Sequence, residues 1–193
     1  MRQHLLEHLG IAMQYVNDRR NSKVLPKWGS YINVRLQAYQ GIGDEVKSFA
    51  QLIPELAFYK SIGHKSAVVL SGRLGGVLGI GDATFYQSAF IGGHENLLGY
   101  RQYRYAGKHS LYNNLELRLK VADIASYVLP GEFGLTGFWD IGRVWVENDD
   151  SNKWHNGTGG GIYFVPASLF SLSFFMGHSN EGWYPYFSMG FRF

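Results

Sequence analysis

The chain has 193 residues, a formal net charge of +3 and no cysteine. So small and dispersed a charge argues against nucleic-acid binding, and the lack of any run of about 18 apolar residues excludes a helical membrane span. Glycine is abundant, with 25 residues, and 16% of all residues are aromatic. This composition favours many β-strands with tight turns and belts of aromatic side chains.

Segments in which apolar and polar residues alternate recur along the whole chain. Alternation is typical of β-strands, because successive side chains of a strand point to opposite faces. It does not fit a helix, where it would place apolar residues on every side. The segments predicted as strands span about residues 9–18, 31–40, 49–61, 66–77, 112–121, 133–146, 158–165, 168–177 and 185–193.

Residues 112–121 alternate most clearly, since an aliphatic face backs a polar and charged one. The aliphatic face carries Leu115, Leu117, Leu119 and Val121, and the other face carries Asn114, Glu116, Arg118 and Lys120. A soluble β-sandwich or a lipocalin-like barrel would bury the first face, whereas a membrane barrel would turn it toward lipid. Alternation alone does not separate these folds.

The last nine residues favour the membrane fold. Phe187, Met189, Phe191 and Phe193 share one face of the predicted strand, and lipid is a suitable environment for such an aromatic face. Several segments also reach the roughly 9–11 residues that a membrane strand needs. We therefore predict an all-β, antiparallel, up-and-down transmembrane β-barrel. The predicted strands, about eight or nine, would form all or half of a barrel.

One connection is much longer than the others, at roughly residues 79–110, and is rich in aromatic residues, glycine and arginine. Long ordered loops in otherwise compact folds are usually functional. We expect this loop to matter for the function.

Five stretches show a further pattern when they are read in order. They are residues 17–34 (with Asp18, Arg20, Pro26, Gly29 and Tyr31), 92–107 (GGHENLLGYRQYRYAG), 110–121 (SLYNNLELRLKV), 137–145 (GFWDIGRVW) and 188–193 (SMGFRF). Together they resemble the C-terminal barrel of the bacterial surface antigen superfamily, the outer-membrane assembly and translocation factors of the BamA and TamA type. The resemblance covers nearly the whole chain, so residues 1–193 are expected to form one outer-membrane barrel domain, without a periplasmic domain.

The resemblance also implies three groups of functional residues. The lumen loop motif falls on Leu98, Gly99, Tyr100, Arg101 and Arg104; its strand partner falls on Phe138, Asp140 and Gly142; and the C-terminal signal falls on Ser188, Gly190, Phe191 and Phe193. Phe191 and Phe193 are expected to face lipid.

One position departs from the family pattern. The arginine that precedes Gly-Tyr in the family loop, and pairs there with the strand aspartate, falls on Leu98. Strand parity places Asp140 on the inner face, so we expect Arg101 or Arg104 to supply the missing cation. Two other interpretations remain: Asp140 is solvated by water in the lumen, or the arginines contact lipopolysaccharide phosphates at the rim.

The resemblance implies a barrel that assists insertion, assembly or translocation of proteins at the outer membrane of a bacterial cell. The alternatives are a small structural or pore-forming barrel, or the membrane anchor of a further domain. Expected partners are outer-membrane lipid and lipopolysaccharide, a second copy of the chain, or other outer-membrane proteins.

The sequence contains no recognisable catalytic motif, and its seven histidines are scattered. We therefore expect neither an enzyme nor a metal or other cofactor. The first residues do not have the features of a signal peptide. We expect the chain to be a processed form, or the C-terminal part of a longer protein.

Overall fold

The computed structural model describes residues 7–42, 47–63, 66–81, 88–127, 129–146, 152–190 and 192–193. Nine long strands form one antiparallel sheet in the order β1-β2-β3-β4-β7-β8-β9-β10-β11. The strands are β1 (Glu7–Asp18), β2 (Gly29–Ile42), β3 (Phe49–Ile62), β4 (Val68–Gly81), β7 (His109–Ile124), β8 (Gly131–Trp145), β9 (His155–Pro166), β10 (Leu172–Ser179) and β11 (Gly182–Met189). The prediction of an up-and-down antiparallel sheet is confirmed.

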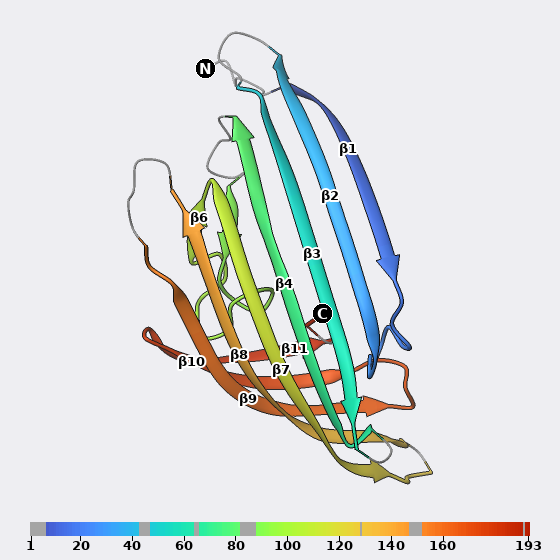
Figure 1. Cartoon of the computed structure of the whole chain (residues 1–193). Coiled ribbons are helices and arrows are strands. Elements are labelled where there is room, and N and C mark those ends of the chain that lie inside the picture. The colour runs from blue at the N-terminus through green and yellow to red at the C-terminus, as the bar shows by residue number, and fades with distance from the viewer. Residues whose placement is uncertain are drawn as a thin grey trace, which may run out of the picture.

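The sheet is strongly curved, and residues 88–108, the described part of the segment between β4 and β7, lie inside the curve (Figure 1). This segment contains a small hairpin of β5 (Ala89–Ile91) and β6 (Tyr105–Gly107). We call the concave side of the sheet the lumen side. Among the described residues no ladder joins β1 to β11, so the sheet is an open wall that corresponds to half a barrel. No helix in the described part of the chain is long and apolar enough to cross a membrane.

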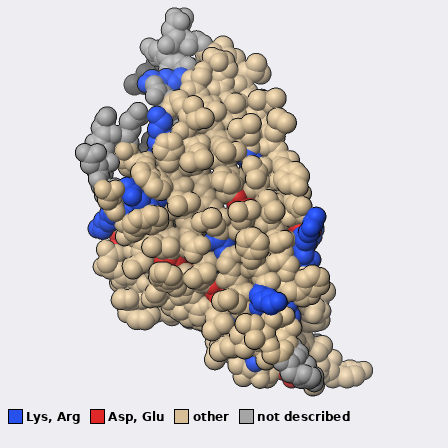
Figure 2. Space-filling view, in the orientation of Figure 1, with Lys and Arg blue, Asp and Glu red and all other residues tan. Residues whose placement is uncertain are grey.

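The polarity of the sheet is the reverse of that in a soluble β-protein. On β7 the side chain of Leu117 is 41% exposed, whereas Glu116 and Arg118 on the lumen face are only 4% and 2% exposed. On β1 the outward residues Leu9, Ile11, Met13 and Tyr15 are likewise exposed, although on this edge strand most residues of the lumen face are exposed as well. Most of the face seen in Figure 2 carries neither acidic nor basic side chains. An exposed aliphatic face over a buried charged one rules out the soluble sandwich and suits contact with lipid.

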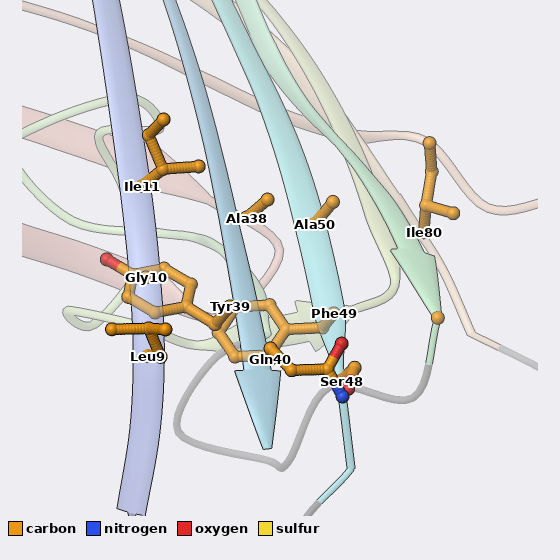
Figure 3. Close-up of a pocket in the computed structure, with 11 residues that line it drawn as sticks. Leu9, Gly10, Ile11, Ala38, Tyr39, Gln40, Ser48, Phe49, Ala50 and Ile80 are labelled. Carbon is orange, nitrogen blue, oxygen red and sulfur yellow. The ribbon is translucent and has the colours of Figure 1, made fainter. Parts of the chain in front are cut away.

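Aromatic rings of the lumen face fit over glycines of neighbouring strands. The ring of Tyr39 on β2 covers Gly10 on β1 so closely that a Cβ at Gly10 would overlap it. Tyr39 also stacks on Phe49 of β3, with ring centroids 4.9 Å apart (Figure 3). Because a ring fits only where the facing residue has no side chain, such contacts help to fix the register of adjacent strands.

The C-terminus differs from the expected strand of residues 185–193. β11 ends at Met189, and Gly190 has a positive φ of +125°. This conformation interrupts the alternation of faces. Of the remaining described residues, Arg192 lies on the inner side, as the parity of β11 predicts, whereas Phe193 departs from that parity and also lies on the lumen side.

Candidate functional site

Residues 88–108, the described part of the segment between β4 and β7, are packed against the lumen side of the sheet. Ile91, Leu97 and Tyr100 form one buried cluster against the wall. Leu98 belongs to a second cluster, with Phe138 of β8 and Phe175 of β10. Leu98 is 0% exposed. Two apolar clusters therefore seat the loop on the wall, and the leucine at the departing position packs against β8 and β10 in the second.

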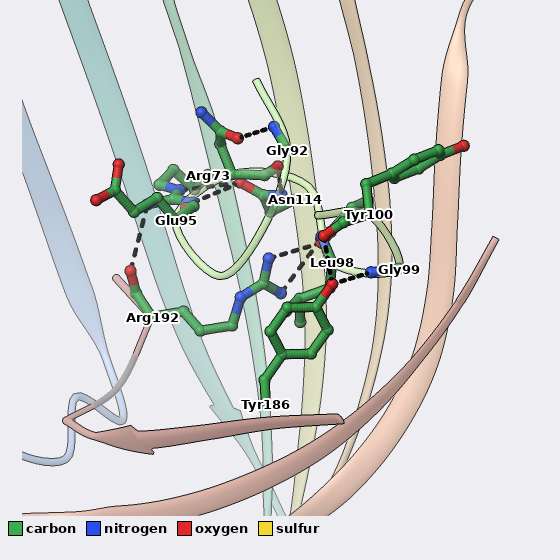
Figure 4. A network of polar contacts seen from close by, with 11 residues as sticks. Arg73, Gly92, Glu95, Leu98, Gly99, Tyr100, Asn114, Tyr186 and Arg192 are labelled. Atoms are coloured by element: carbon green, nitrogen blue, oxygen red, sulfur yellow. Dashed lines mark hydrogen bonds and ion pairs between the residues drawn. The ribbon is translucent and has the colours of Figure 1, made fainter. Parts of the chain in front are cut away.

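Asp140 of β8 binds the loop and the C-terminus together. Arg192 donates from Nη1 to Oδ1 over 3.2 Å and from Nη2 to Oδ2 over 2.6 Å. The backbone N–H of Leu98 donates to Oδ2 over 2.9 Å. The side chains of the ion pair are both 0% exposed. In Figure 4 the guanidinium of Arg192 points from the C-terminal segment toward the loop. We call Asp140, Arg192 and the Leu98 backbone the lumen anchor.

The prediction that Arg101 or Arg104 pairs with Asp140 is wrong. Arg104 donates from Nε to Glu181 over 2.7 Å, in the turn between β10 and β11. Arg101 is exposed. The place beside the carboxylate is filled by Arg192, so neither loop arginine is needed to neutralise Asp140.

Gly99 and Tyr100 extend the contact between the loop and the last two strands. The hydroxyl of Tyr186 on β11 accepts the N–H of Gly99 over 2.9 Å and donates to the carbonyl of Tyr100 over 2.6 Å. The hydroxyl of Tyr100 in turn lies 3.0 Å from both the carbonyl of Asn156 and Oδ1 of Asn180. Gly99 has a φ of +94°, a conformation that glycine adopts without strain.

Small residues in the wall make room for the loop. A Cβ at Gly157 of β9 would overlap the carbonyl oxygen of Leu98. A Cβ at Gly142 would lie 3.2 Å from Cδ1 of Ile91. Gly142 thus lies against the loop, two residues after Asp140, while Phe138 packs on Leu98. The Phe-x-Asp-x-Gly stretch of β8 touches the loop at all three of its positions.

Arg73 of β4 joins the same network from two strands away, in the row where Arg73 pairs with Asn114 of β7 and Asn114 with Asp140 of β8. It donates from Nε to Oδ1 of Asn114 over 3.0 Å and from Nη1 to the carbonyl of Arg192 over 3.2 Å. A further N–H of Arg73 binds the carbonyl of Glu95 in the loop. The ring of Phe193 lies 4.8 Å from the Arg73 guanidinium carbon, in cation–π range.

The expectation that Phe193 faces lipid is also wrong. Its ring lies 6.3 Å from that of Tyr59, a buried residue of the lumen face. The chain turns at Gly190, whose φ is positive, and after this turn both Arg192 and Phe193 lie on the lumen side. Ser188 remains in β11, and its hydroxyl donates to the carbonyl of Gly190 over 3.1 Å. Phe191 lies outside the described residues.

Two loop side chains have altered acid–base properties. Burial lowers the pKa of His94, and the nearby charges of Arg192 and Arg73 lower it further. Burial raises the pKa of the Tyr100 hydroxyl. Both side chains are therefore held in their neutral forms near pH 7.

Arg192, Arg73 and Tyr186 were not recognised as site residues from the sequence. Arg192 carries a signal that could have been used, since it is the single charged residue after Glu181. Such an isolated cation on a predicted inward face calls for a buried carboxylate. No group of three or more acidic or histidine side chains within the described ranges is placed to hold a metal ion.

An antiparallel sheet with an exposed apolar face, and a loop anchored on its polar inner face, are typical of a membrane β-barrel domain with an internal loop. The family model of the Omp85 superfamily domain matches residues 6–181. The chain therefore belongs to the Omp85 superfamily, whose members are outer-membrane proteins, and the resemblance seen in the sequence is confirmed. A comparison with curated proteins found no match. The matched region includes Leu98 and Asp140 and ends at residue 181, just before β11 begins.

Proposed function

We propose that the protein assists the insertion or translocation of other proteins at the outer membrane of a bacterial cell, without enzymatic chemistry. One observation carries this proposal: an inverted sheet of Omp85 type has two edge strands that are unpaired among the described residues. Unpaired backbone groups are costly in a membrane. An incoming strand that adds to such an edge satisfies its own backbone groups and those of the edge at the same time.

The lumen anchor supports the proposal by keeping the wall rigid behind the edge. The loop is bound to β8 through Asp140, to β11 through Tyr186 and to β4 through Arg73. Strands far apart in the sheet are thereby held in one curvature while an edge strand exchanges partners.

A structural or pore-forming barrel is the second candidate, and Leu98 at the place of the family arginine favours it. Arg192 weighs against this candidate, because it supplies from the C-terminus the cation that the loop lacks. On the rim, exposed Arg101 is suited to contact lipopolysaccharide phosphates.

The test is a folding assay in liposomes that contain the purified protein. The probe is an unfolded eight-stranded outer-membrane barrel, whose folded form is recognised by its shifted mobility on an unheated gel. We expect the probe to fold several times faster than in empty liposomes or in liposomes that hold an equal amount of a closed barrel. Equal rates would refute assisted insertion, and steady ion conductance together with equal rates would favour the pore.

A further inference from the structure

The outward face of the sheet, opposite to the lumen side, carries very few cations. Among the described strands, alternation places two on this face, Lys60 of β3 and Arg143 of β8. Arg143 donates from Nη2 to Oδ1 of Asn152 over 2.7 Å, and its guanidinium carbon lies 4.7 Å from the ring centroid of Trp145. Lys60 is exposed, and its ammonium makes no hydrogen bond or ion pair with the described residues. It is therefore a cation without a counter-charge on an apolar face.

The strands around Lys60 supply no carboxylate on the outward face. The neighbours of β3 in the sheet, β2 and β4, contain no acidic residue. The acidic residue of β3, Glu55, lies on the lumen side, where its Oε2 accepts the hydroxyl of Tyr112 over 3.3 Å. A counter-charge for Lys60 can instead come from the phosphate of an anionic lipid.

An apolar groove of about 420 Å³ begins beside Lys60 on the outward face. Phe58 pairs with Gly72 of β4, and Gly72 pairs with Leu115 of β7. Because Gly72 has no side chain, the surface is low between the two larger residues. Lys60 and its partner Leu70 lie one step closer to the end of β3. We call Phe58, Lys60, Leu70, Gly72 and Leu115 the lysine groove.

The lysine groove lies near one edge of the membrane. β3 ends at Ile62, two residues or about 7 Å beyond Lys60. The long β4–β7 connection leaves from the opposite end of the wall (Figure 1). In bacterial barrels the longer connections are extracellular and the short turns periplasmic. The groove therefore opens at the periplasmic side. Trp28, which is 59% exposed, precedes the groove residue Gly29, and tryptophan is typical of this boundary.

We propose that the lysine groove binds an anionic phospholipid of the periplasmic leaflet. The phosphate pairs with the ammonium of Lys60, and one acyl chain lies along Gly72 between Phe58 and Leu115. One lysine close to an anionic lipid gives a preference of about fivefold over a zwitterionic lipid. The inference rests on the membrane location of the sheet and holds whether or not the protein inserts other proteins.

A second groove at the same end of the wall provides an internal comparison. It measures about 140 Å³, and none of its lining residues is charged. We call it the phenylalanine groove; on the outward face it is lined by Phe133, Ile162, Phe164, Leu172, Phe174 and Phe187. Any lipid covers this groove by apolar contact alone, so it should not distinguish anionic from zwitterionic lipids.

The test is photo-crosslinking of lipids to the protein in phosphatidylcholine vesicles. The probes are a phosphatidylglycerol and a phosphatidylcholine that carry the same photoreactive group in one acyl chain, and adducts are located by mass spectrometry of peptides. At the lysine groove we expect at least threefold more adduct from phosphatidylglycerol than from phosphatidylcholine. At the phenylalanine groove the ratio should be close to one. Equal ratios at the two grooves would overturn the proposal, because they would show ordinary lipid contact.

Charge variants separate Lys60 from general attraction to a basic protein. Lys60→Gln should reduce the ratio at the lysine groove to about one, whereas Lys60→Arg should keep it. Arg143→Gln removes the outward cation at the other end of the wall and should leave the ratio unchanged. A ratio that survives Lys60→Gln, or that falls equally in Arg143→Gln, would overturn the proposal.

A pair of glycine variants tests the seat of the acyl chain. A Cβ at Gly72 would have its nearest neighbour, Cδ2 of Leu115, at 3.4 Å, so Gly72→Leu fills the groove from its floor. This variant should lower the adducts of both lipids at the lysine groove at least threefold. Gly137→Leu adds the same bulk to the outward face of β8 and should change neither. Equal adducts in both variants would contradict the seat, and gel mobility without heating confirms that each variant is folded.

Discussion

Replacing Arg192 by methionine is the sharpest test of the lumen anchor. The change removes two charge-assisted hydrogen bonds to the Asp140 carboxylate, whose side chain is 0% exposed. The N–H of Leu98 still donates to this carboxylate. Breaking a buried ion pair by removing one partner costs about 3–5 kcal/mol. We expect Arg192→Met to lower the free energy of unfolding by this amount, and Asp140→Asn by a similar one.

The double variant separates the pair from its surroundings. Because neither charge is left alone, Arg192→Met with Asp140→Asn should cost no more than the worse single change, which gives a coupling energy of about 3 kcal/mol. Urea unfolding in vesicles, followed by tryptophan fluorescence and by gel mobility, measures these values. The single variants should also be cleaved faster by protease between residues 88 and 108.

Strictly additive single effects would refute the reasoning, as would an Arg192→Met variant within about 0.5 kcal/mol of the parent. Arg192→Lys is the conservative control. It keeps the charge but not the two-bond geometry, and its stability should fall between those of the parent and the methionine variant.

Three further changes probe how the loop is seated, each read as the rate of protease cleavage in the loop. Gly157→Ala should push the Leu98 carbonyl away, lower the stability of the seated loop by about 1–3 kcal/mol and raise the cleavage rate. Gly137→Ala, whose Cβ would have its nearest neighbour at 3.9 Å, should leave the cleavage rate unchanged. Equal rates for the two variants would contradict the packing of Gly157 against Leu98. Tyr186→Phe removes the hydroxyl that binds two loop backbone groups. It should lower the stability of the seated loop by about 1–3 kcal/mol and so raise the rate of cleavage. An unchanged rate would contradict this role of the hydroxyl. His94 has a pKa below its value in the unfolded chain. Its neutral form therefore contributes fully to folding stability above about pH 6.5, and this contribution is lost as the pH falls through the folded pKa. Cleavage should rise as the pH is lowered from about 7.5 to 5, and His94→Gln should abolish that rise.

The strands could be predicted because each depends on local alternation. Residues 112–121 alternate without interruption, and β7 carries its exposed leucines and buried charges as that pattern requires. The alternation alone does not tell which of the two faces is exposed and which is enclosed. It follows from the curvature of the whole sheet, which decides which face is enclosed.

The position of Phe193 could not be predicted from alternation, because the chain turns at Gly190, although alternation places Arg192 on the correct, inner face. Nothing in the local pattern distinguishes a strand that continues through Gly190 from one that turns there. The turn is stabilised by Asp140, which lies 52 residues away from Arg192 in the sequence. The loop arginines Arg101 and Arg104 were the wrong candidates although they lie nearer to Asp140 in sequence than Arg192 does, because distance along the chain does not fix distance in space.

The distance along the chain between contacting segments also bears on the order in which the fold assembles. Seven of the eight ladders of the large sheet join strands that follow one another directly, and only β4–β7 spans the loop. Hairpins of this kind close quickly, since little chain entropy is lost. The contact of Leu98, Asp140 and Arg192 needs three distant segments at once, so it forms after the wall has curved. Under mild denaturant it should be the earliest to open, and hydrogen exchange at the Leu98 amide would report that opening.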